Sequence, residues 1–439
     1  MTGFAGTFLT GATSRLLPAS IPFRYFGAAV VFHIAAWIAL VAGADGMPRF
    51  AGGLGWPLVV LHLTTLGVLA MTAIGASLQL LPVATRRSVG AIRWPAAIWW
   101  VYTPGVVVVA VGMGTGIVVL LAAGAAAIVL ALAIYGVLLA RNLIGAKGMP
   151  AVVAHGWGAL ASLVVVLATA ASLAGAYAGA PGLARGTAVA LHGVFAVYGF
   201  MGMLALGLSY ILVPMFALSP APRDRVALIS LAFAVAALLL TGTAAFGLAP
   251  QPLRIAAIVA GTVSISVHLR LMTAALATGL RRALGRSFRL VRIAWACLAA
   301  SLALALGIVV DVPFEGTNAL FGVVVIGGWL LTFVLGILQR IVPFLASMHA
   351  SRGVPGVKRR LPTPSSLTAE RPLAIHFACH LVALALLTLA IIAESAVAAR
   401  VGALVGTVGA IAFAAFFVIA MRRMAAPAPG TNPRAAHAA

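Results

Sequence analysis

The sequence predicts an all-α integral membrane protein with about twelve transmembrane helices in three pseudo-symmetric four-helix repeats. Three features predict this fold class: the composition, the number of long apolar runs, and a glycine–glycine–proline pattern that occurs three times. Of the 439 residues, 63% are hydrophobic and only 8% are charged. A soluble domain carries roughly a quarter charged residues, so the composition excludes a soluble globular protein.

Twelve apolar runs are long enough to cross a bilayer, which takes about 20 helical residues. The first six lie at 21–43, 56–82, 94–113, 116–140, 151–178 and 187–214. The second six lie at 226–248, 253–278, 291–311, 318–343, 373–396 and 398–422. We therefore expect one membrane domain over 21–424, between an N-terminal segment (1–20) and a disordered C-terminal tail (425–439).

The second, sixth and tenth runs share a pattern in which two glycines precede a proline, with seven and then about six residues between them. Its members are Gly67, Gly75 and Pro82, then Gly199, Gly207 and Pro214, then Gly328, Gly336 and Pro343. The nearly constant interval between these copies indicates an internal repeat. The predicted repeats are about 21–145, 146–282 and 283–424, and each patterned helix is expected to end at its proline.

The distribution of positive charge predicts the orientation. With twelve spans, all Lys and Arg residues except Arg49, Arg185, Arg254 and Arg400 fall at or near the face that carries both termini. Cytoplasmic loops carry the excess of Lys and Arg, so we expect both termini and the long loop at 349–372 to be cytoplasmic in a bacterial-type inner membrane. The net charge of +22 then reflects loop asymmetry, and no nucleic-acid partner is expected.

The paired glycines have two interpretations. Residues eight apart share one broad helix face, and small residues there let a neighbouring backbone or a flat ligand approach closely. Gly67, Gly75, Gly199 and Gly207 are therefore predicted either to contact a cofactor or to pack helices together.

Two histidines stand at nearly the same depth in patterned helices, His62 in the second and His192 in the sixth. Polar residues inside a bilayer are candidates for function, and neutral imidazole is a ligand for haem iron and for copper. We therefore predict His62 and His192 as ligands of a haem, with copper as the other candidate metal. The alternative is that each one hydrogen-bonds a neighbouring group inside the bundle.

A second candidate metal site lies in the eleventh helix. His376, Cys379 and His380 stand at i, i+3 and i+4, which places them on one helix face. Sulfur together with imidazole suits Cu(I) or Zn. The alternative is a histidine pair at the membrane interface beside a packed cysteine.

The stretches HLTTLGVLAMTAIGASLQLLPV (62–83) and HGVFAVYGFMGMLALGLSYILVP (192–214) resemble the histidine-containing helices of the haem–copper oxidase subunit I superfamily. They are most similar in character to the nitric oxide reductase large subunit and the NnrS proteins. The resemblance implies that His62 is a ligand of a low-spin haem and that His192 lies on the helix that offers a ligand to copper.

The chain also departs from that superfamily. The tenth helix has no histidine, where the oxidases use two, and the seventh lacks the adjacent histidine pair that binds copper. The oxygen-reducing centre of the family cannot be assembled from these residues.

The resulting functional hypothesis is a haem-binding protein, with or without copper, that acts in electron transfer or in a nitric oxide response together with a redox partner or partner subunit. Whether it is an enzyme is left open. The alternatives are a transporter or metal-handling protein that reuses the fold, and a partner subunit without cofactors.

Overall fold

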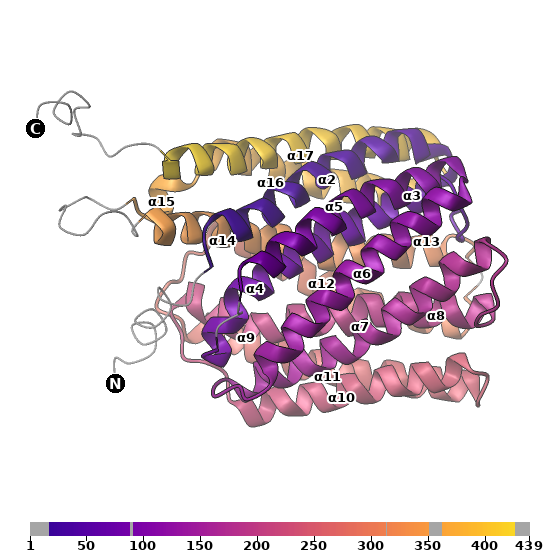
Figure 1. The fold of residues 1–439 in the computed structure, drawn as a ribbon, viewed down its shortest axis with the longest axis horizontal. Coiled ribbons are helices and arrows are strands. Elements are labelled where there is room, and N and C mark those ends of the chain that lie inside the picture. Colours follow the sequence, from indigo (N-terminus) through magenta and orange to yellow (C-terminus); the bar gives the residue numbers. More distant parts are fainter. Residues whose placement is uncertain (1–16, 88–90, 313, 351–361, 426–439) are drawn as a thin grey trace, which may run out of the picture.

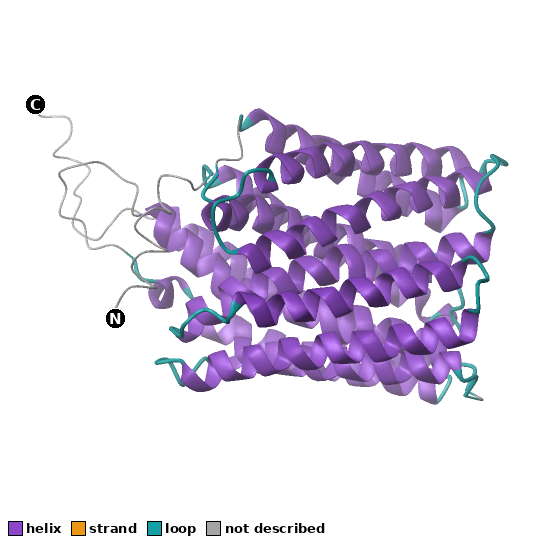
Figure 2. Cartoon of the chain, turned by 90° about the horizontal axis from the view of Figure 1, so that it is seen from below, coloured by secondary structure: helices purple, strands orange, loops and turns teal. Residues whose placement is uncertain are grey.

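The computed structural model describes residues 17–87, 91–312, 314–350 and 362–425, and these residues form helices and no strand. Twelve helices are long and apolar enough to span a bilayer, which confirms the predicted multi-pass membrane protein. Parts of the predicted N-terminal segment (1–20), of the loop at 349–372 and of the tail (425–439) lie outside the described residues. The helices run side by side, with the connections gathered at the two ends of the bundle (Figures 1 and 2).

Three spans are composite, because each contains a π-helical stretch between two α-helices. They are α3 (Trp56–His62), η2 (Leu63–Ala70) and α4 (Met71–Thr85), then α8 (Arg185–Val194), η3 (Phe195–Gly202) and α9 (Met203–Ala217), then α13 (Thr317–Gly322), η4 (Val323–Leu331) and α14 (Thr332–Ala350).

The other nine spans are single α-helices, with a short 3₁₀ turn, η1 (Ala44–Gly46), after the first and a short helix, α15 (Pro364–Leu367), before the eleventh. They are α2 (Ser20–Gly43), α5 (Arg93–Thr115), α6 (Val118–Leu143), α7 (Pro150–Tyr177), α10 (Asp224–Ala245), α11 (Pro250–Thr278), α12 (Gly285–Val309), α16 (Glu370–Ile392) and α17 (Ala396–Ala425).

The three composite spans form the inside of the bundle. In the most apolar stretch of the span at Arg185–Ala217, 89% of the residues are buried, against 17% in the span at Asp224–Ala245. The π-helical stretches meet one another, because η4 contacts both η2 and η3. These three spans therefore supply the protein interior, while helices such as α10 face the lipid.

The prediction that these spans end at their prolines is wrong. Pro82, Pro214 and Pro343 all lie inside the helices, which continue to Thr85, Ala217 and Ala350. A membrane helix tolerates proline because neighbouring groups satisfy the freed backbone.

The first and last spans are neighbours, since α2 packs along α17 (Figure 1). The Trp37 ring lies against Gly406, and the Phe417 ring lies 3.6 Å from the position that a Cβ would take at Gly27. We call the end of the bundle where α2 begins and α17 ends the terminal face, and the opposite end the distal face.

Two exposed ion pairs join segments distant in sequence at the distal face. Arg400 lies 2.9 Å from Asp45, and Arg49 pairs with Glu394. The hydrogen bonds that the Glu394 carboxylate accepts raise the pKa of Arg49. Exposed pairs contribute little stability, so the main effect of these contacts is to hold the loop after α2 against the turn between α16 and α17.

Candidate functional site

A cavity of about 1020 Å³ lies among the three composite spans, and its wall includes both His62 and His192. Residues of α2, α5, α6, α7, α12 and α16 and of the loop after α2 complete the wall, which is mainly apolar. Its volume is at the upper end of the roughly 300–1,000 Å³ found for ligand pockets. The structure thus brings together the two histidines that were predicted to share one site.

The imidazole rings of His62 and His192 have centres 6.5 Å apart, and their planes are inclined by 24°. Two imidazoles that bind one metal from opposite sides, each at about 2.0–2.1 Å, have centres about 6 Å apart. The observed separation is therefore close to that of a two-histidine metal site.

The hydrogen bonds of these rings indicate which nitrogen is available. Nδ1 of His62 lies 3.1 Å from the carbonyl oxygen of Leu58, and a carbonyl only accepts, so this nitrogen carries the proton. Nδ1 of His192 lies 3.4 Å from the hydroxyl oxygen of Thr169, which donates its own proton to Val165. Both rings therefore hold their proton on Nδ1 and leave the lone pair of Nε2 for a metal, as is common in metal-binding histidines.

Two polar residues that sequence reasoning did not assign to the site also line this cavity. Arg185 donates a hydrogen bond of 2.8 Å to the Tyr177 hydroxyl, and its guanidinium lies 5.1 Å from the centre of the Tyr177 ring. An arginine at the distal end of an apolar cavity suits a ligand carboxylate. The sequence did single out Arg185 in one respect: it is one of only four basic residues predicted at the face opposite the termini.

The predicted cofactor-contacting glycines do not line the cavity. A Cβ at any of them would meet a side chain of the preceding span, in the pairs Gly67–Phe32, Gly75–Tyr25, Gly199–Ser162 and Gly207–His155. In the tenth span Gly328 likewise packs against Cys297 of the preceding span, and Gly336 packs against the Ser287 carbonyl and Leu290. Of the two interpretations of these glycines, the structure favours helix packing.

The second predicted site is arranged differently from the expectation. The rings of His376 and His380 lie 5.5 Å apart and are buried, but Cys379 packs against Gly409 of α17. The third member of the cluster is His33 of α2, whose ring lies 6.1 Å from that of His376. Within the described ranges, no three His, Cys, Asp or Glu side chains are arranged to hold a metal ion.

Hydrogen bonds explain why this histidine cluster does not suit a metal ion. Nε2 of His33 accepts a bond of 3.0 Å from the Trp37 indole, so its proton is on Nδ1. His376 donates from Nδ1 to the Gly409 carbonyl at 3.2 Å, so its free nitrogen, Nε2, has a lone pair. A metal ion requires a lone pair from each ligand. The unpartnered nitrogen of His33, Nδ1, carries a proton instead, so His33 does not offer a lone pair to a metal.

We expect Cys379→Ser to leave the metal content of the purified protein unchanged, because Cys379 is packed against α17 and not joined to the histidines. Elemental analysis of the variant beside the unmodified protein measures this. A loss of bound copper or zinc in the variant would restore Cys379 as a ligand.

Comparisons with known proteins give no family for this chain: no protein-family model matches the sequence, and no curated protein is similar enough to count as a match. The assignment of a function therefore rests on the geometry of the cavity and of its two histidines.

Proposed function

We propose that this membrane protein binds haem in the central cavity, with His62 and His192 as the axial ligands. The observation that carries the proposal is the pair of imidazoles on two helices, with ring centres 6.5 Å apart and both in the wall of one large cavity. Because hydrogen bonds occupy Nδ1 of each ring, Nε2 is the nitrogen that would bind iron.

The donor set favours haem over a bare copper ion. His62 and His192 supply only two ligands, and no third His, Cys, Asp or Glu joins them among the described residues. In haem the porphyrin supplies the remaining four nitrogens. The mainly apolar wall suits the macrocycle, and Arg185 is placed to pair with a carboxylate at its edge.

We further infer that the chain has the three-repeat fold of haem–copper oxidase subunit I, as the resemblance of 62–83 and 192–214 implies. Two regularities support this inference. Each composite span packs its glycines on the span before it, in the second and sixth spans against residues seven apart, and each π-helical stretch begins 19 or 20 residues before the proline.

A haem with two histidine ligands supplies reversible one-electron chemistry. The residues of this chain would hold the iron, exclude water with an apolar wall and set the ring orientation through Leu58 and Thr169. We therefore propose a role in electron transfer or in a nitric oxide response, in a bacterial-type inner membrane with both termini cytoplasmic and with a redox partner.

The test is the absorption spectrum of detergent-purified protein from a haem-replete host, recorded oxidised and reduced, with a pyridine haemochrome assay. We expect a Soret band that shifts on reduction, the sharp α and β bands of six-coordinate haem, and about one haem per chain. A folded but colourless protein without iron would overturn the proposal and favour the transporter or the cofactor-free subunit. Copper analysis of the same sample separates haem alone from haem with copper.

A further inference from the structure

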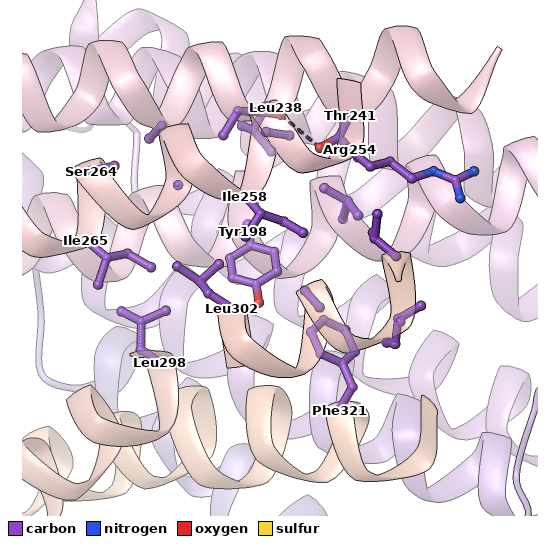
Figure 3. Close-up of a pocket in the computed structure, with 18 of the residues that line it drawn as sticks. Tyr198, Leu238, Thr241, Arg254, Ile258, Ser264, Ile265, Leu298, Leu302 and Phe321 are labelled. Atoms are coloured by element: carbon purple, nitrogen blue, oxygen red, sulfur yellow. Dashed lines mark hydrogen bonds between the residues drawn. The ribbon is translucent and has the colours of Figure 1, made fainter. Parts of the chain in front are cut away.

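A second cavity, of about 380 Å³, is lined by α10, α11 and α12 and by residues of the composite spans at Arg185–Ala217 and Thr317–Ala350 (Figure 3). Tyr198 and Phe321 line both this cavity and the one that contains the histidines. We call it the lateral cavity, because two of its helices, α10 and α11, are among the spans with little buried surface. Neither His62 nor His192 lines it.

The hydroxyl groups in the wall of the lateral cavity already have partners within the protein. Thr241 donates to the Ala237 carbonyl at 2.8 Å, Ser264 donates to the Ser230 carbonyl at 2.7 Å, and the Tyr198 hydroxyl lies 2.8 Å from that of Ser301. The remaining wall is alanine, leucine, isoleucine and other apolar side chains. Such a wall offers no hydrogen bond to a polar ligand and suits a hydrocarbon chain.

One charged residue stands at the edge of this cavity. Arg254 lies in the first turn or so of α11, near the distal face, and its side chain extends from the cavity so that the guanidinium points away from the apolar wall (Figure 3). Long basic side chains near a helix end place their charge at the level of the lipid headgroups.

Arg254 differs from the other three distal arginines. Arg49 and Arg400 form ion pairs, and Arg185 is bonded to Tyr177. In the part of the chain that the structure describes, Arg254 has no hydrogen-bond or ion-pair partner. The acidic residue Asp311 follows the end of α12, which lines the same cavity, but it forms no ion pair with Arg254. A free guanidinium beside an apolar cavity complements an anionic headgroup joined to an apolar chain.

We propose that the lateral cavity binds an acyl chain of an anionic phospholipid from the distal leaflet, whose phosphate pairs with Arg254. Basic residues at pockets between membrane helices recognise lipid headgroups in this way. The chain supplies most of the contact area, and the guanidinium selects for negative charge.

The test compares the binding of phosphatidylglycerol and phosphatidylcholine to the full-length protein by native mass spectrometry. Arg254→Gln removes the charge, and Arg270→Gln, an exposed residue near the other end of the same helix, is the matched control. We expect Arg254→Gln to weaken phosphatidylglycerol binding about fivefold, the factor for about 1 kcal/mol per basic residue. Phosphatidylcholine binding and the control variant should be unchanged.

A second variant tests the cavity itself. The nearest atom to a Cβ at Gly261 lies 3.7 Å away and Gly261 is in the cavity wall, so Gly261→Leu fills the space without a backbone clash. We expect it to weaken the binding of both lipids. Equal phosphatidylglycerol binding by the unmodified protein and Arg254→Gln would overturn the proposal. It would also be overturned if the co-purified occupant were a neutral isoprenoid lipid lost only from Gly261→Leu.

Discussion

Haem should be lost from the protein when both His62 and His192 are replaced by alanine. The double variant removes both proposed axial bonds, and no other His, Cys, Asp or Glu joins this pair as a third ligand in the described residues. Loss of the partners that merely orient metal ligands already costs about 10–100-fold in metal affinity, so loss of both ligands should leave only background haem. The pyridine haemochrome assay on equal amounts of folded protein measures the result.

The single variants and a control make this result specific. His62→Ala or His192→Ala alone should leave five-coordinate iron, with a weaker affinity and a high-spin spectrum. His349→Ala changes a histidine at the end of α14, away from the cavity wall, and should keep full haem content. A double variant that retains about one haem per chain would remove both residues from the site.

The second large effect should come from alanine at the packing glycines. A Cβ at Gly67 would lie 2.6 Å from the Cβ of Phe32, and one at Gly207 would lie 2.7 Å from the Cβ of His155. Because these partner atoms are fixed to the backbones of α2 and α7, the helices themselves must move apart. Overpacking of this kind costs about 1–3 kcal/mol, so both variants should show a lower Tm in a thermal unfolding assay.

Gly186→Ala is the matched control for this experiment. Gly186 also lies in a composite span, in α8, but nothing lies within 4 Å of the position of its Cβ. Gly186 is in the first turn of α8, and alanine loses less backbone entropy than glycine, so this variant should be neutral or slightly more stable. If Gly67→Ala and Gly207→Ala behaved like the control, the two glycines would not be points of close helix contact.

The spans were predictable from the sequence because length and hydropathy alone determine what crosses a bilayer. The fifth span is an example: the sequence predicted it at 151–178, and α7 extends over Pro150–Tyr177. The tenth span was predicted too short, at 318–343 rather than Thr317–Ala350. The reason is that proline stops helices in water more strictly than it does in a membrane protein, where neighbours satisfy the backbone.

The pairing of His62 with His192 was also predictable, from depth and from the repeated pattern. The π-helical stretches were not, since no residue type marks a wider turn. They matter because the rotation of about 100° per residue expected for an α-helix does not hold across η2 and η3. In the structure His62 and His192 lie in the cavity wall, while Gly67 and Gly207 pack against α2 and α7.

The histidine cluster shows a different limit. His376 and His380 are neighbours within one helix, and their spacing was visible in the sequence. His33 joins them only because α2 lies near α16 and α17 in the folded bundle. A contact across more than 340 residues has no local signal, and the protonation of His33 depends on its hydrogen bond from Trp37.

The packing of α2 along α17 has a consequence for biogenesis. Because α2 precedes α17 in the chain, the face of α2 that carries Trp37 stays uncovered until Gly406, which receives that ring, has been synthesised. A chain that lacks α17 therefore leaves the face of α2 around Trp37 exposed to the membrane. The contact between α2 and α17 can therefore form only after α17 has entered the bilayer.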